Sequence, residues 1–438
     1  MNSSSPPYSL PLRIPASKAS ASPSVAFVWT LVLPGFVLSP VADFLSVYAS
    51  HGALPTGGSD ARFSLFLRGA IVFGLIAAML IGGKIRRSGL YLSLLVFVGI
   101  LSSGVAYALD IASGPEFGEQ SIFVLKVFSF FVYFGALSEL GDRRLAKLEW
   151  FVRLALFAYG ICIVTGAALS IEMFHSYQGD THIRSGYKGI VHAQNEASAL
   201  VTVGLAFAYL GVLRSGWRVR EILLAGSLLA ASMLIGTKGA VIGALGVTCA
   251  YFYARHNAFR ASARAALVLG TLAALAILAY VAIPKIQQAV DLTLNYFEYQ
   301  GGRASGDRLL TILLSGRNLK FANVWDGVAQ QNYIALLTGG YPVTRYMVEM
   351  DIPDLVLTLG LPAFVVYFMA LRGAFVYGGK PCSTTRFGKL FFYLIAGVAA
   401  TAGHVFGSAL VAPFLAVIAV IVKRYASSGS QRGNLDVV

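Results

Sequence analysis

Apolar runs of about 20 residues recur along most of the chain, separated by short polar, basic or glycine-containing segments. A helix of about 20 apolar residues crosses the roughly 30 Å hydrocarbon core of a bilayer. Because the runs are continuous and do not alternate residue by residue, they favour helices over the strands of a membrane barrel. The pattern therefore predicts an all-α polytopic membrane protein with about twelve transmembrane helices. The expected spans are 25–48, 63–83, 89–110, 120–140, 150–173, 192–213, 220–236, 238–254, 264–283, 353–371, 387–403 and 406–423.

These spans divide the chain of 438 residues into five parts. Residues 1–24 are rich in Ser and Pro and lack the apolar core of a signal peptide, so we expect a flexible cytoplasmic tail. Helices one to nine occupy 25–283, helices ten to twelve occupy 353–423, and 424–438 forms a second cytoplasmic tail. The long loop 284–352 connects the two helical parts. Long loops inside compact proteins are usually functional, so we expect chemistry on the face that carries this loop.

The composition excludes soluble enzymes, nucleic-acid-binding modules and disordered scaffolds. Hydrophobic residues make up 57% of the chain and charged residues only 12%, with a mean hydropathy of +0.70. The net charge of +14 comes mostly from basic clusters between apolar runs, so no nucleic-acid partner is expected. Roughly 22 of the 34 basic residues fall on one side, which the positive-inside rule makes cytoplasmic. Both termini are then cytoplasmic and the long loop lies outside.

Several polar residues precede or enter the sixth expected span. If this span starts near His192, then His192, Asn195 and Glu196 lie on one helical face, with Arg184 and Lys188 on the outer side. Polar groups at membrane depth usually face a water-filled cavity or a partner, which makes these five residues candidate substrate contacts. Interfacial anchoring and an ion pair that supports helix packing are the alternative.

A lysine flanked by glycines stands at the outward turn between spans seven and eight. The sequence is Gly236-Thr237-Lys238-Gly239-Ala240. Glycines allow close approach to a ligand, and the amides at the start of the next helix can meet an anion. A lysine that only marks the membrane surface is the alternative.

The long loop carries arginines that topology does not require. Arg303, Arg308, Arg317 and Arg345 are candidates for phosphate binding, because a guanidinium binds phosphate bidentately and stays charged. Aromatic residues between them, including Tyr341, could stack on sugar rings. Solvated ion pairs within the loop are the alternative for any single arginine.

Acidic residues close this loop as the tenth span begins. Glu349 and Asp351 could accept a proton from a sugar hydroxyl, with Asp354 following inside the span. Carboxylates in the first turn of a helix also suit its dipole, which is the alternative explanation.

These segments, in this order, resemble the O-antigen ligase and polymerase family of bacterial surface-glycan enzymes. Arg184-Ser-Gly with Asn195-Glu196-Ala is similar to that family's loop-to-helix segment, and 236–240 is similar to its Ser-Arg-Gly-Ala turn, with lysine in place of arginine. Ser315-Gly316-Arg317, Trp325, Gly339-Gly340 and the stretch from Glu349-x-Asp351 to Gly360 resemble its long periplasmic loop and the following span. The resemblance covers 180–370.

The resemblance implies a GT-C-like helical bundle whose periplasmic loop caps a cavity. It implies a glycosyltransferase of the bacterial inner membrane that acts on undecaprenyl-diphosphate-linked oligosaccharide at the outer leaflet. Arg184, Lys238 and Arg317 would hold the diphosphate while an acceptor hydroxyl attacks the anomeric carbon. No metal, nucleotide sugar or other cofactor is expected. A chain-length regulator and a flippase are left open as partners.

This chain departs from the family's ligases at one place, the end of the long loop. Its ligases usually carry a His-Asn pair near the end of the long loop, where this chain has Val348-Glu349-Met350-Asp351 and the loop contains no histidine. This favours a polymerase of repeat units for O-antigen, capsule or exopolysaccharide, with Glu349 or Asp351 as the base and His192 as an outside alternative. A ligase of the same family remains open. So does a transporter or flippase, for which Arg68, Lys126 and Arg153 could line a pathway.

Overall fold

The computed structural model describes residues 23–50, 62–82, 87–176, 185–302, 307–343, 347–378, 382–403 and 405–433. Regular structure within these ranges is helical, and the β contact found there is one isolated antiparallel bridge between His175 and Tyr187. Six of the described helices, α1, α2, α4, α5, α6 and α9, are long and apolar enough to cross a membrane. The predicted class, an all-α membrane protein, is confirmed at this level. The parts of the expected tails at 1–22 and 434–438 lie outside the described residues.

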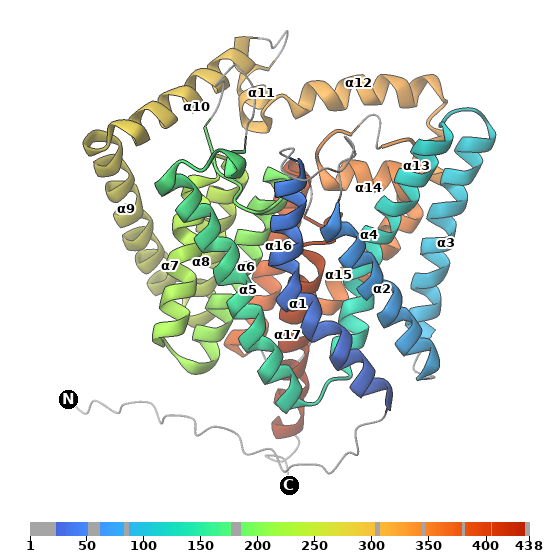
Figure 1. Cartoon of the computed structure of the whole chain (residues 1–438), viewed down its shortest axis with the longest axis horizontal. Coiled ribbons are helices and arrows are strands. Elements are labelled where there is room, and N and C mark those ends of the chain that lie inside the picture. The colour runs from blue at the N-terminus through green and yellow to red at the C-terminus, as the bar shows by residue number, and fades with distance from the viewer. Residues whose placement is uncertain are drawn as a thin grey trace.

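The helices within the described ranges follow one another along the chain as shown in Figure 1. They are α1 (Pro23–Ser50), α2 (Phe63–Ile81), α3 (Arg87–Ala108), α4 (Gly114–Ser138), α5 (Asp142–Leu169), the 3-10 helix η1 (Glu172–Phe174), α6 (Gln194–Ser215), α7 (Val219–Leu234), α8 (Lys238–Arg255), α9 (Ala258–Ala282), α10 (Pro284–Gly302), α11 (Arg308–Leu314), α12 (Arg317–Gln330), α13 (Ile334–Thr338), α14 (Asp351–Leu359), α15 (Leu361–Phe375), α16 (Ser383–Thr401) and α17 (Ala412–Gly433).

Helices α6 and α17 form the centre of the bundle. Every residue of 197–212 in α6 and of 412–422 in α17 is buried, as expected for helices that are apolar on all sides. Helix α6 packs against α7, α8, α16 and α17. A Cβ on Gly204 of α6 would lie 3.0 Å from Leu228 and 3.1 Å from Leu156, so a small residue here lets three helices approach closely.

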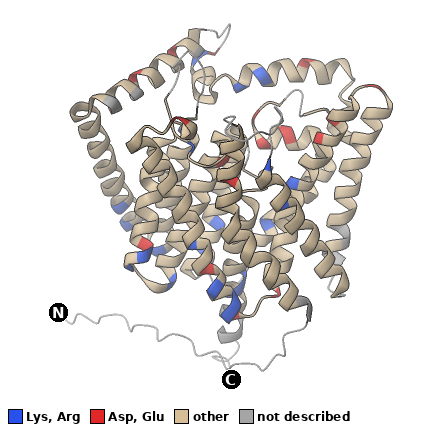
Figure 2. Cartoon of the chain, in the orientation of Figure 1, with Lys and Arg blue, Asp and Glu red and all other residues tan. Residues whose placement is uncertain are grey.

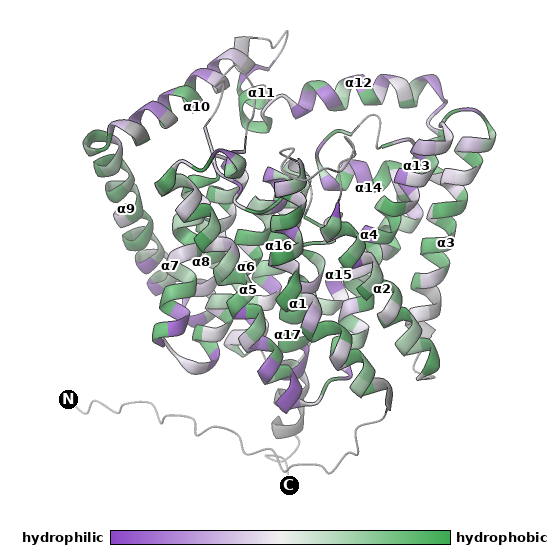
Figure 3. Cartoon of the chain, in the orientation of Figure 1, coloured by the Kyte–Doolittle hydropathy of each residue, from purple (hydrophilic) through white to green (hydrophobic). Residues whose placement is uncertain are grey.

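Exposed positions on the outer helices are apolar as well, and Figure 3 colours these helices mainly as hydrophobic. The side chains of Phe66 and Ile81 are 79% and 84% exposed, and Leu267 of α9 is 71% exposed. A soluble protein rarely exposes a continuous apolar surface of this kind, whereas lipid tails solvate it. The bundle therefore has a mostly apolar interior and an apolar outer surface, as expected of a membrane protein.

Helices α10, α11 and α12 extend across one end of the bundle (Figure 1). Helix α9 runs along the side of the bundle and leads into α10, so the predicted long loop is largely helical. Val324 and Val328 of α12 pack with Tyr341, Val348 and Met350 into a small apolar cluster of their own. This cluster holds α12 over the end of the bundle.

Lys and Arg gather at the opposite end (Figure 2). Some of these charges are paired there: Arg214 contacts Glu149 at 2.8 Å and Arg153 contacts Glu221 at 3.1 Å. Arg424 also pairs with Asp142. The two ends of the molecule therefore differ in charge as well as in the elements that cover them.

The expected span 353–371 is not one continuous helix. It is divided into α14 and α15 at Gly360, which has a φ of +78°. A Cβ there would lie 2.9 Å from the backbone nitrogen of Gly339, so α13 packs too closely for a side chain. Pro362 then stands in the first turn of α15, where its missing N–H is harmless.

The expected span 406–423 also starts later, at Ala412. Helix α16 ends at Thr401, and the chain between the two helices is irregular where the structure describes it. This connection, residues 402–411 without His404, is called the 402–411 segment below. It is longer than the two-residue connection left between the expected spans 387–403 and 406–423.

Candidate functional site

A cavity of about 700 Å³ lies where the bundle meets α11 and α12. Its wall comes from the start of α6, the start of α8, helices α10, α11, α12 and α16, and the residues Met347, Glu349, Ala402, Gly403 and Val405. Four residues singled out from the sequence line it: Asn195, Lys238, Arg317 and Glu349. The fold thus brings together side chains that are up to 154 positions apart in the sequence, from Asn195 to Glu349.

Arg317 is the first residue of α12 and connects three parts of this wall. Its Nη1 donates to the Thr401 carbonyl at 3.1 Å, and its Nη2 donates to Asn195 Oδ1 at 3.4 Å. Ser315 and Gly316 just before it have φ values of +55° and +80°, which turns the chain sharply between α11 and α12. The guanidinium is thereby fixed at the cavity wall, with an exposed fraction of 17%.

Glu349 presents a carboxylate to the same cavity between two cations. Lys320 Nζ donates to its Oε1 at 2.5 Å, and Arg317 Nε lies 3.8 Å from its Oε2. The φ of Glu349 is +64°, a left-handed conformation that costs a non-glycine residue about 1–2 kcal/mol. A Cβ on Gly403 would lie 3.0 Å from the Glu349 carbonyl, so the 402–411 segment presses closely on this backbone. Strained residues of this kind cluster at functional sites.

Lys320 is a member of the site that the motifs did not single out. It lies three residues after Arg317, and on a helix this spacing places two side chains on one face. That spacing is the sequence signal that could have identified it.

Lys238 reaches the cavity from the start of α8. Thr237 caps this helix by accepting from the Ala240 N–H at 3.2 Å, and its hydroxyl also lies 2.6 Å from Ser198 of α6. The ammonium group of Lys238 donates to the carbonyl of Ile312 in α11. The predicted turn therefore joins α6, α8 and α11 at the cavity.

The helical face expected for His192, Asn195 and Glu196 forms only in part. Helix α6 begins at Gln194, so His192 precedes it and is exposed, and the expected helical register for this residue is wrong. Lys188 Nζ donates to the His192 carbonyl at 2.8 Å, and burial lowers the pKa of this lysine. Glu196 Oε1 accepts from Ser408 Oγ at 2.8 Å, which ties α6 to the 402–411 segment.

Asp351 and Asp354 have partners of a different kind from those of Glu349. Asp351 is buried, and its Oδ2 accepts from the N–H groups of Val405 at 2.7 Å and Phe406 at 2.6 Å. Asp354 Oδ1 accepts from the Val348 N–H at 3.0 Å. Neither carboxylate is among the described residues that line the cavity. Both hold backbone segments in place beside it.

Two further candidates, Tyr341 and Arg308, are not among the described residues that line the cavity. Tyr341 is buried and its carbonyl accepts from Gln120 Nε2 at 2.9 Å. Arg308 is exposed at the start of α11. The other three candidates fall outside the described residues: Arg184, Arg303 and Arg345.

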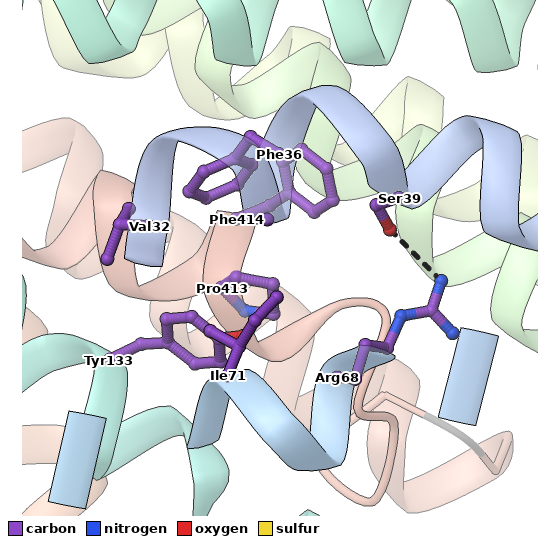
Figure 4. A pocket seen from close by; sticks show the side chains of 9 residues that line it. Val32, Phe36, Ser39, Arg68, Ile71, Tyr133, Pro413 and Phe414 are labelled. Atoms are coloured by element: carbon purple, nitrogen blue, oxygen red, sulfur yellow. Dashed lines mark hydrogen bonds between the residues drawn. The ribbon is translucent and has the colours of Figure 1, made fainter. Parts of the chain in front are cut away.

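A second polar cluster is buried among α1, α2 and α5. Arg68 Nη2 lies 2.5 Å from Asp43 Oδ2, which also accepts from the Tyr159 hydroxyl at 2.5 Å. Figure 4 shows Arg68 extending to Ser39, a contact of 3.2 Å, beside a pocket that includes Tyr133. The pocket measures about 10 Å³, roughly the space of one water molecule. The charges of Arg68 and Asp43 balance each other, and the pocket beside them is too small to admit a substrate.

No protein-family model matches the chain, and no curated protein matches it either. Among the described residues, no group of three or more His, Cys, Asp or Glu side chains is arranged to hold a metal ion.

Proposed function

We propose that this protein is a polysaccharide repeat-unit polymerase, which joins undecaprenyl-diphosphate-linked oligosaccharides at the periplasmic face of the bacterial inner membrane. The observation that carries the proposal is the cavity at one end of an apolar bundle, which Lys238, Arg317 and the carboxylate-bearing Glu349 all line. It supports the function that the motif resemblance implies.

Cations at the cavity suit a diphosphate. Arg317 and Lys238 come from different helices, so together they can contact both phosphate groups of a lipid-linked donor. As the bond between sugar and phosphate breaks, negative charge grows on the leaving oxygen, and fixed cations stabilise that charge. A cavity of about 700 Å³ lies within the usual size range of small-molecule sites.

The acceptor half of the reaction needs a proton acceptor. In the proposed step the acceptor hydroxyl attacks the anomeric carbon of the donor, its proton passes to Glu349, and undecaprenyl diphosphate leaves with the bonding electrons. Tyr296 and Tyr393 also line the cavity and offer rings against which sugars can stack. Glu349 is preferred to Asp351 as the base because the two backbone N–H groups already occupy Oδ2 of the latter.

The proposed orientation places both termini in the cytoplasm and the cavity on the periplasmic side, in a bundle of twelve spans. The gathering of basic residues at the end away from α12 supports it, because such residues are enriched on the cytoplasmic side. The bilayer and the lipid-linked oligosaccharide are the proposed partners.

A ligase of the same family would use the same cavity and would differ in its acceptor. For a transporter, the break between α14 and α15 is a favourable feature. Two of the three cations that could have lined a transport pathway are paired instead, Arg68 with Asp43 and Arg153 with Glu221. Glycosyl transfer therefore explains the charged cavity better than transport does.

Deletion of the gene in the native host tests this function. Lipid-linked oligosaccharides are extracted and the surface polysaccharide is sized. A polymerase leaves single lipid-linked repeats and no polymer when it is missing, whereas a missing ligase leaves long chains on the diphosphate lipid. Unchanged polymer and intermediates would contradict both enzymatic functions.

A further inference from the structure

We propose that Glu349 occupies the anion site of the unliganded protein and that a phosphate group of the substrate displaces it. This proposal rests on the proposed polymerase function. Binding of the diphosphate would free the Glu349 carboxylate, which then accepts the proton of the acceptor hydroxyl. The anion site is defined here as the space between Arg317 and Lys320 on α12.

The carboxylate of Glu349 lies next to two cations, Lys320 and Arg317. Lys320 Nζ is 2.5 Å from Glu349 Oε1 and Arg317 Nε is 3.8 Å from Oε2, so both cations face the same group. A phosphate offers three acceptor oxygens and more charge than a carboxylate. It can therefore compete for the same two cations.

The exposure of these groups makes the exchange feasible. The Glu349 side chain is 37% exposed and that of Lys320 is 50% exposed. Solvated ion pairs of this kind are weak, because water and salt screen them. A ligand that brings additional contacts to the cavity can therefore replace one partner.

The backbone around the site is held independently of the Glu349 carboxylate. Arg317 keeps its bonds to the Thr401 carbonyl and to Asn195 when Glu349 moves. The chain on either side of Glu349 is fixed, since Asp354 accepts from the Val348 N–H and the Asp351 N–H donates to the Ala402 carbonyl at 3.3 Å. Displacement then needs only a rotation of the side chain, which leaves the carboxylate beside the cavity.

The test measures binding of inorganic pyrophosphate to the full-length protein in lipid nanodiscs by titration calorimetry. Glu349→Gln removes the internal competitor, so it should bind pyrophosphate about fivefold more tightly than the wild-type protein, the factor that corresponds to a weak exposed ion pair. Arg317→Met and Lys320→Met should each bind it more weakly. Asp326→Asn is the matched control, because it removes one negative charge at an exposed position of α12, the helix of Arg317 and Lys320, and should leave affinity unchanged.

Glu349→Asp provides a second variant should the glutamine variant fail to fold. Its shorter carboxylate reaches Lys320 less well, so an affinity between those of the wild-type protein and a variant without the carboxylate is expected. Equal affinities in wild type and both Glu349 variants, with weaker binding in Arg317→Met, would overturn the displacement and leave the anion site in place. If Arg317→Met bound pyrophosphate as the wild type does, the anion site itself, and with it the proposed function, would be contradicted.

Discussion

Glu349 and Asp351 lie two residues apart, yet their carboxylates have different surroundings. Glu349 has a left-handed backbone and faces a cavity, while Asp351 is buried and accepts from two backbone N–H groups. The sequence predicted both as candidate bases and could not separate them. The difference depends on where the 402–411 segment passes, and that is fixed by contacts about 50 residues away in the sequence.

The two residues should respond differently to the same chemical change. In Asp351→Asn the remaining side-chain oxygen can still accept from Val405 and Phe406, so polymer length should change little. In Glu349→Gln no proton acceptor remains, so polymer should disappear at normal protein levels. Sizing of the surface polysaccharide together with immunoblots of the membrane fraction measures both. Loss of polymer in Asp351→Asn at a normal protein level would make Asp351 the base instead.

Asp351→Leu separates the structural role from the chemistry. It leaves buried N–H groups without their acceptor, at about 1–3 kcal/mol for each group. The free energy of unfolding should fall accordingly, and the protein should melt at a lower temperature in detergent. A melting temperature equal to that of wild type would show that the bonds to the 402–411 segment contribute nothing.

Most described helices begin and end close to the apolar runs, because the length and continuity of such runs are local properties of the sequence. Helix α2, for example, spans 63–81 where 63–83 was expected, and α8 spans 238–255 where 238–254 was expected. The differences at α14–α15 and at α17 arise from contacts that no local pattern records: Gly360 packed against α13, and the backbone bonds of Asp351. That twelve spans cross the membrane stays a prediction.

Gly360 tests whether the break between α14 and α15 is required. In Gly360→Ala the side chain meets the backbone of Gly339, and the positive φ adds about 1–2 kcal/mol of strain. We expect a lower melting temperature and less protein in the membrane. Gly373→Ala is the control on α15, since a Cβ there has no neighbour within 4 Å and alanine favours the helix. Equal stability of the two variants would contradict a required break.

The charged residues of the molecule gather in three places. Lys and Arg gather at one end, charged residues line the cavity at the other end, and an ion pair is buried between helices. The sequence predicted that Asn195, Lys238, Arg317 and Glu349 belong to one site, and the fold places these four around one cavity. It could not predict that Asp43 pairs with Arg68, because the two lie on different helices and only packing brings them together. The same limit applies to the contribution of Thr401 to the cavity.

The buried pair should be more sensitive to the loss of one partner than of both. Arg68→Met leaves Asp43 buried without its cation, a change that typically destabilises a protein by about 3–5 kcal/mol. The double variant Asp43→Asn with Arg68→Met removes both charges and should recover much of that loss. Melting curves of the four proteins form a double-mutant cycle. Additive effects of the two substitutions would mean that the pair does not couple α1 to α2.

Chain growth by the purified protein tests polymerase activity itself. Proteoliposomes receive single lipid-linked repeats from the deletion strain, and polymer length and released undecaprenyl diphosphate are measured over time. The wild-type protein should lengthen the chains and release one diphosphate lipid for each bond formed. Arg317→Ala should do neither, while Arg143→Ala, an exposed basic residue at the other end, should act as wild type. No chain growth by the wild-type protein, or undiminished growth by Arg317→Ala, would contradict the proposed function.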